Sequence, residues 1–433
     1  MRQFENQIRG AAPFFSVFLL CTVMVAQNFL SSELFPPLAV FAGVLVLVLS
    51  FGKIKHSYLK LVWPLLGVFL IGIVGSFNHA PHDILRDVAF ALVPFALIFI
   101  GYWFGGDERM WPLILKIMVL CGFVLAVIHL STFVINPELL SAGVEEVRLT
   151  AGGGGVLVTI AMVLGLFQYR LGVGRLSPKY LPRFIFLPVL FASFVLSYSR
   201  TDLIVAIIFS LALGGALSRI NLRSVLIVVV LAVSFVALIV MVPEDETGTL
   251  RSKLARSATE VAVYNYEDMA DINANWRGFE TYRALVSFSS GSVAQQIFGQ
   301  GFGALVDLGF VMDFGKVDGV QLQYIPILHN GYAYILIKTG LLGLACYVFF
   351  YASLIRYAVR YSDPLNGEQR LLSRLLLGCV LSLIMIMYVV GGMAQTAGPA
   401  LVLLLGYLTR RLELLRKSSL PEYGRDKSLV GGP

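Results

Sequence analysis

The chain has 433 residues, of which 58% are hydrophobic and only 14% are charged. Its mean hydropathy is +0.81, whereas soluble globular proteins are about 45–50% apolar and about 25% charged. The excess apolar surface has to face lipid, which excludes a cytosolic enzyme and a nucleic-acid-binding protein as starting hypotheses. The net charge of +7 would suggest an anionic partner if it lay on one surface, so the basic residues first have to be assigned to the two sides of the membrane.

Apolar runs follow one another along the chain, separated by charged or turn-forming residues. A helix needs about 20 apolar residues to cross the hydrocarbon core. Several runs are shorter, so their ends are approximate and a pair of them is compatible with a re-entrant segment. The first run lacks a cleavage site behind a short apolar core, which predicts a retained helix. The sequence therefore predicts an all-α, polytopic membrane protein of about 12 transmembrane helices. The runs are Ala12–Leu30, Leu38–Phe51, Leu61–Phe77, Val88–Phe104, Pro112–Ile135, Val156–Tyr169, Phe184–Ser199, Leu203–Leu217, Ser224–Val242, Tyr332–Ala352, Leu375–Val390 and Ala397–Leu408.

The distribution of positive charge gives the orientation, because lysine and arginine stay on the cytoplasmic side of short connections. With the N-terminus inside, the inner connections and the C-terminal tail hold most of these residues. The short outer connections hold only Arg86, Arg148 and Arg200. Both termini are therefore expected in the cytoplasm.

One outer connection is much longer than the others, from about Pro243 to Leu328. Leu250–Tyr266 and Asn275–Phe288 mix charged and apolar residues at helical spacing, which predicts short helices on the membrane surface. The polar segment after Leu415 is expected to be disordered. The predicted division is nine transmembrane helices in residues 1–242, a partly helical periplasmic loop in 243–328, three transmembrane helices in 329–413 and a cytoplasmic tail in 414–433.

The three outer arginines are informative because the positive-inside tendency selects against them there. Arg86 opens the fourth run, Arg148 precedes the sixth, and Arg200 lies between the seventh and the eighth. All three arginines are expected at the outer membrane interface, where the paired donors of a guanidinium group can bind a phosphate. The alternative is that each arginine reaches lipid headgroups or pairs with a nearby carboxylate, Asp87 for Arg86 and Asp202 for Arg200.

His329 lies at the outer mouth of the tenth run, where the long loop ends. Imidazole readily takes a proton from a hydroxyl near neutral pH, although a histidine here is also a common capping or interfacial residue. The same loop carries Trp276, Arg277, Tyr282 and Arg283. These residue types suit sugar rings and phosphates, and they equally suit the headgroup belt.

Lys338 lies about six residues inside the tenth run, roughly 9 Å along a helix. It either extends to the interface or meets an acidic partner. Gly340 and Gly343 follow it, and their spacing allows a close helix crossing.

Three segments together resemble the O-antigen ligase and polymerase superfamily. His329-Asn330 followed by Gly340-Leu341-Leu342-Gly343 resembles the family's His-Asn…Gly-Leu signature. Ser197–Asp202 looks like its Ser-Arg element, and Gly299–Gly303 is similar to its glycine-rich outer loop. The order of the segments and their side of the membrane agree as well.

The resemblance implies a GT-C-like glycosyltransferase of lipopolysaccharide biosynthesis at the periplasmic face of a bacterial inner membrane. Such enzymes move a glycan from undecaprenyl pyrophosphate to an acceptor hydroxyl with inversion, without a metal or another cofactor. His329 would then be the general base, and Arg200 and Arg148 would hold the pyrophosphate. Arg86, Arg277 and Arg283 are further candidates for the pyrophosphate, chosen from charge and membrane side, with Asn330, Gly340 and Gly301 as supporting residues.

Two functions within the family, and one outside it, stay open. The ligase transfers a finished chain to lipid A-core, whereas the polymerase transfers it to another repeat unit. One large outer loop ahead of the histidine favours the ligase, because polymerases often carry two. A secondary transporter shares the twelve-helix layout, but carriers place charged or helix-breaking residues near the bilayer midplane, whereas here the charge gathers at the outer rim.

Overall fold

The computed structural model describes residues 17–31, 33–50, 54–142, 146–147, 150–152, 155–177, 182–217, 263–264, 266, 268–313, 321–360, 367–391, 393 and 398–419. Within these residues the chain is mainly helical, and five helices are long and apolar enough to cross a membrane. They are α3 (His56–Val74), α4 (Pro81–Phe104), α5 (Met110–Ile135), α15 (Gly331–Arg360) and α16 (Gly367–Val390).

Other helices account for most of the remaining apolar runs. They are Val17–Ala26, α2 (Phe35–Leu49), α7 (Gly155–Leu166), α8 (Arg183–Leu196), α9 (Arg200–Gly214) and α17 (Pro399–Ser419). All of the predicted runs except Ser224–Val242, which lies outside the described residues, therefore coincide with helices. The number of twelve membrane crossings stays a prediction.

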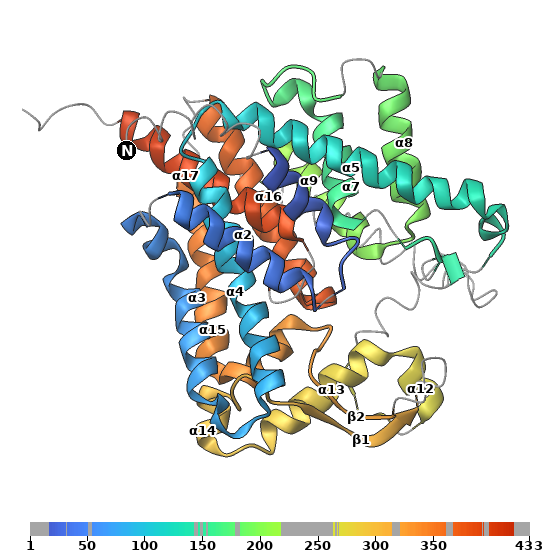
Figure 1. Cartoon of the computed structure of the whole chain (residues 1–433), viewed down its shortest axis with the longest axis vertical. Helices are drawn as coiled ribbons and strands as arrows, with labels where there is room; N and C mark the ends of the chain where they lie inside the picture. Colours follow the sequence, from blue (N-terminus) through green and yellow to red (C-terminus); the bar gives the residue numbers. More distant parts are fainter. Residues whose placement is uncertain are drawn as a thin grey trace, which may run out of the picture.

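The helices form one bundle in which α4 is the central element. It packs against α2, α3 and α17, while α15 lies between α3 and α16, and α5, α7, α8 and α9 form the adjoining part (Figure 1). Glycines allow the closest of these approaches, because a Cβ at Gly101 of α4 would collide with the Leu403 carbonyl of α17, and one at Gly406 would collide with the Ile98 carbonyl.

The long connection forms a small layer of its own at one end of the bundle (Figure 1). It contains α12 (Met269–Ala274), α13 (Trp276–Ser289), α14 (Val293–Phe298), β1 (Val306–Asp313) and β2 (Gln321–Ile325). We call this end the loop end, and the opposite end, where α17 finishes, the tail end. The expected helix at Asn275–Phe288 is confirmed by α13. Most of the other expected helix, Leu250–Tyr266, lies outside the described residues.

The two strands add an element that was not predicted for this connection, which was expected to be partly helical. β1 and β2 pair antiparallel, with Val306 opposite Ile325 and a bulge between Asp307 and Met312. Val306 and Leu308 are buried whereas Gly309 is exposed, which is the two-residue alternation of a half-buried strand.

A break at Gly340 divides α15 within the predicted tenth span. Gly340 has φ 64° and ψ −168°, so the helix consists of two parts that meet at this residue. The part after the break, Leu341–Arg360, has about 20 residues, close to the 30 Å of a bilayer core at 1.5 Å per residue. The preceding part, Gly331–Thr339, belongs to the loop end. The predicted span Tyr332–Ala352 therefore contains the break, and its limits in the membrane stay a prediction.

We expect Gly340→Ala to destabilise the protein by about 3 kcal/mol, because this backbone conformation is nearly exclusive to glycine. A Cβ there would also collide with the Ile297 carbonyl and the Gly299 amide. The melting temperature in detergent measures the effect. Gly214→Ala is the matched control, since Gly214 has open space around its Cα. Equal melting temperatures for the two variants would contradict the interpretation of the break.

Candidate active site

The residues Gly299–Gly303, which we call the glycine strap, connect the break in α15 to the end of α3. In an α-helix each backbone carbonyl accepts a hydrogen bond from the amide four residues later. The break at Gly340 interrupts this pattern for the carbonyls of Ile337 and Lys338. The strap supplies replacements, because Gln300 N donates to Ile337 O at 2.8 Å and Gly301 N donates to Lys338 O at 3.0 Å. The strap is thus part of the packing that shapes α15.

Gly301 shows why this segment is rich in glycine. Its φ is +89°, and a Cβ there would collide with the backbone of Gly75 at the end of α3. Next to it, Phe302 N donates to Gly72 O at 2.9 Å, and the Phe302 ring is buried. The structure therefore places Gly301 at a contact between backbones, and contact with a ligand stays a prediction.

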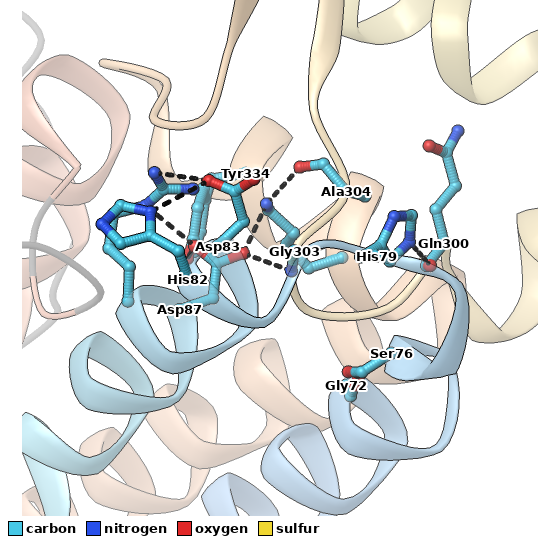
Figure 2. Close-up of polar contacts among 12 residues, drawn as sticks. Gly72, Ser76, His79, His82, Asp83, Asp87, Gln300, Gly303, Ala304 and Tyr334 are labelled. Carbon is cyan, nitrogen blue, oxygen red and sulfur yellow. Dashed lines mark hydrogen bonds and ion pairs between the residues drawn. The ribbon is translucent and has the colours of Figure 1, made fainter.

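A buried ion pair holds the strap to α4 and α15 (Figure 2). Lys338 Nζ lies 2.5 Å from Asp87 Oδ2, and the two side chains are 2% and 0% exposed. Lys338 Nζ also donates to the Ala304 carbonyl. Asp87 accepts from Gly303 N at 2.7 Å and from the Tyr334 hydroxyl at 3.0 Å. Of the two alternatives for Lys338, the acidic partner is the one that the structure shows.

Arg86 lies beside this ion pair on α4. Its Nη1 lies 2.9 Å from Asp83 Oδ1, its Nε lies 3.7 Å from Asp87 Oδ1, and its side chain is 11% exposed. Both Nε and Nη2 are buried without a hydrogen-bond partner among the described residues. Buried guanidinium donors without acceptors are costly, so this position suits an incoming anion.

His329 precedes α15 and forms the second polar cluster of the loop end. Its Nδ1 lies 2.7 Å from Glu280 Oε2 of α13, and its backbone N donates to the same oxygen at 3.2 Å. The imidazole is 43% exposed, whereas the Glu280 side chain is 4% exposed. Asn330 caps the helix, since its Oδ1 accepts from Tyr332 N at 3.0 Å and from Ala333 N at 3.3 Å.

Glu280 was missed by the sequence analysis although the residues around it were singled out. It shares the buried face of α13 with Phe279 and Ala284, and a carboxylate on an apolar helix face needs a partner. A carboxylate among the apolar residues of this helix face was the sequence signal for a buried, paired Glu280.

Tyr266 packs edge-on against Phe279. Burial, together with Tyr264 and Asp271, raises the pKa of the Tyr266 hydroxyl to about 12, so this hydroxyl stays protonated at neutral pH.

The other predicted arginines have different surroundings. Arg283 Nε donates to the Asp307 carbonyl at 2.9 Å, which fastens α13 to β1. Arg277 is half-buried on the same helix. Arg200 is the first residue of α9, whose N-cap Ser199 accepts from Asp202 N at 3.2 Å. Arg148 lies outside the described residues.

The structure thus brings four helices together at the loop end: α4, α13, α14 and α15. His329 directly precedes α15, and α15 carries Lys338, packs against α13 and α14, and is tied to α4 through Asp87. Among the described residues, no group of three or more His, Cys, Asp or Glu side chains could hold a metal ion.

Comparison with known proteins assigns a family to the part of the chain that holds most of these residues. Residues 184–348 match the sequence model of a family described as O-antigen ligase. This part of the chain is similar to that family. The resemblance inferred from the short motifs is thereby confirmed. The match includes Arg200, Glu280, the glycine strap and His329, whereas Arg86 and Asp87 lie before it. A search of curated proteins and a search of solved structures each found no match.

We expect Lys338→Met to destabilise the protein by about 3–5 kcal/mol, because it leaves the Asp87 carboxylate buried without its cation. The double variant Asp87→Asn/Lys338→Met should lose less than the sum of the two single variants, since a neutral pair removes both charges. Melting temperatures in detergent give this comparison.

The control is Lys116→Met, which removes an exposed lysine of α5 and is expected to change stability by less than about 0.5 kcal/mol. Additive losses in the double variant would show that Asp87 and Lys338 are not energetically coupled.

Proposed function

We propose that the protein is an O-antigen ligase. It transfers a glycan from undecaprenyl pyrophosphate to a sugar hydroxyl of lipid A-core, with inversion and without a metal ion. The family match supports O-antigen ligase or polymerase function in general. The observation that carries the mechanism is the contact of 2.7 Å between His329 Nδ1 and Glu280 Oε2.

His329 acts as the general base in this mechanism. With Nδ1 engaged by Glu280, Nε2 is the ring nitrogen left for the acceptor hydroxyl. The hydroxyl oxygen attacks the anomeric carbon of the donor sugar while its proton moves to Nε2. The bond from that carbon to the pyrophosphate oxygen breaks, and the pyrophosphate leaves on the opposite face.

Glu280 is a positioning residue in this mechanism. A carboxylate that accepts the Nδ1 hydrogen fixes the tautomer with a free electron pair on Nε2. It also stabilises the imidazolium that forms when Nε2 takes the proton. The burial of Glu280 beneath the more exposed ring suits this role, because its charge then acts through a medium of lower dielectric constant than water.

Arginines stabilise the leaving group. Pyrophosphate needs its growing negative charge neutralised, and fixed guanidinium groups do this without reorganisation. Arg86 fits this task, since two of its buried nitrogens lack acceptors among the described residues. Arg200, Arg148, Arg277 and Arg283 complete the proposed set, with Arg283 the most constrained because it already holds the Asp307 carbonyl.

The proposal includes the membrane arrangement. Helices in 1–242 and 329–413 cross the bacterial inner membrane, the loop 243–328 lies in the periplasm, and both termini, with the tail 414–433, lie in the cytoplasm. In support, the short outer connections hold few basic residues, and the polar clusters of His329 and Asp87 lie together at the loop end. A polymerase would use the same chemistry on a different acceptor, and it is the main alternative.

We expect His329→Ala to reduce the rate of glycan transfer about 10²- to 10⁴-fold, the usual contribution of a general base.

Glu280→Gln should lower kcat on the order of a hundredfold and leave the KM for the donor unchanged, since it disturbs the base and not the pyrophosphate site. Steady-state kinetics in proteoliposomes separate the two parameters.

Glu138→Gln is the matched control, because Glu138 is an exposed carboxylate outside the proposed site. Full activity of His329→Ala would overturn the enzyme mechanism and return the transporter to consideration.

The acceptor decides between ligase and polymerase. Purified protein is given the lipid-linked donor with lipid A-core in one reaction and with repeat-unit lipid in another, both with a chelator present. The ligase makes product only with lipid A-core. Product only with repeat-unit lipid would establish the polymerase, and His329→Ala controls for contaminating activity in both reactions.

A further inference from the structure

A cavity of about 460 Å³ opens at the tail end of the bundle, and the α15 residues in its lining begin at Phe350, 21 positions after His329. Residues of α3, α4, α15 and α17 line it. Three basic side chains, Lys60, Arg416 and Lys417, meet there, and its wall includes Trp63, Pro64 and Phe350. The cavity therefore combines basic groups with an apolar wall, and its size lies within the range of about 300–1,000 Å³ typical of ligand pockets.

The acidic residue in the lining is already neutralised by the protein. Glu413 Oε2 accepts from the Tyr102 hydroxyl at 2.5 Å and from Arg410 Nη1 at 2.8 Å, and its Oε1 accepts from Lys417 Nζ at 2.8 Å. Two of these three hydrogen bonds come from cationic groups, which offset the negative charge of the Glu413 carboxylate. The cavity therefore keeps a net positive charge at neutral pH.

The apolar wall continues onto an exposed apolar surface. Trp63 is 53% exposed and Phe349 is 50% exposed, and their ring centroids lie 5.5 Å apart. Trp63 follows Lys60 by one turn of α3. Tryptophan next to lysine at the end of an apolar helix is typical of the membrane–water interface, which is the depth of phospholipid headgroups.

We propose that this cavity binds the headgroup of an anionic phospholipid from the leaflet at the tail end, with an acyl chain lying along Trp63 and Phe349. Basic pockets between transmembrane helices at the cytoplasmic side suit phosphate-bearing headgroups. The apolar wall next to the basic side chains selects an amphipathic lipid over a free phosphate. Because the cavity lies between α3, α15 and α17, the bound lipid holds these helices together. This inference does not depend on the glycan-transfer activity.

Native mass spectrometry of the full chain tests the proposal. The protein in detergent is titrated with phosphatidylglycerol and, separately, with phosphatidylcholine, and the bound lipid is counted. We expect tighter binding of phosphatidylglycerol. Lys60→Gln should weaken it about fivefold, the change that corresponds to about 1 kcal/mol per basic residue at an anionic surface.

Two further variants make the result specific. Arg109→Gln removes an exposed positive charge between α4 and α5 at the same end, outside the cavity lining, and should leave phosphatidylglycerol binding unchanged. Ser353→Trp keeps every charge but fills the cavity and should weaken binding. Equal binding of the two lipids, or equal losses for Lys60→Gln and Arg109→Gln, would overturn the proposal. Displacement of the lipid by glycerol phosphate at equal concentration would assign the cavity to a soluble phosphate instead.

Discussion

The loop end of the molecule depends on one buried ion pair, Lys338 with Asp87. A buried ion pair is stable only when hydrogen bonds satisfy the remaining donors and acceptors. Here the backbone of Gly303 and Ala304 and the hydroxyl of Tyr334 provide those bonds. The pair therefore fixes three segments at once: the start of α4, the glycine strap and the N-terminal part of α15. His329 precedes that part of α15, so its position relative to α4 follows from the same contact.

The break at Gly340 and the glycine strap depend on each other. The break leaves carbonyls without helical partners, and the amides of the strap bond to them. A straight helix would offer no such acceptors, and a strap with side chains at its glycine positions would collide with α3 and α15. A rigid connection of this kind suits a catalytic base, whose distance from the reacting atoms has to be held to a fraction of an ångström.

Much of the helical architecture could be predicted from the sequence, because membrane helices need long apolar runs. The family motifs also pointed to His329 and to the strap. What sequence reasoning missed depends on tertiary contact: Lys338 and Asp87 are 251 positions apart, and His329 and Glu280 are 49 positions apart. Neither partner stands out locally, since Asp87 follows a more conspicuous arginine and Glu280 lies in a stretch noted for arginine and aromatic residues. The strand pair was missed because its two-residue alternation is short and interrupted by a bulge.

The central claim is that the imidazole of His329 and the guanidinium of Arg86 serve one lipid-linked donor at the loop end. An electron cryo-microscopy structure of the protein with an undecaprenyl pyrophosphate-linked sugar bound tests it most directly. We expect diphosphate oxygens within hydrogen-bond distance of Arg86 Nη2 and the anomeric carbon on the side of His329 Nε2. A diphosphate bound away from Arg86, with His329 turned toward lipid, would contradict it.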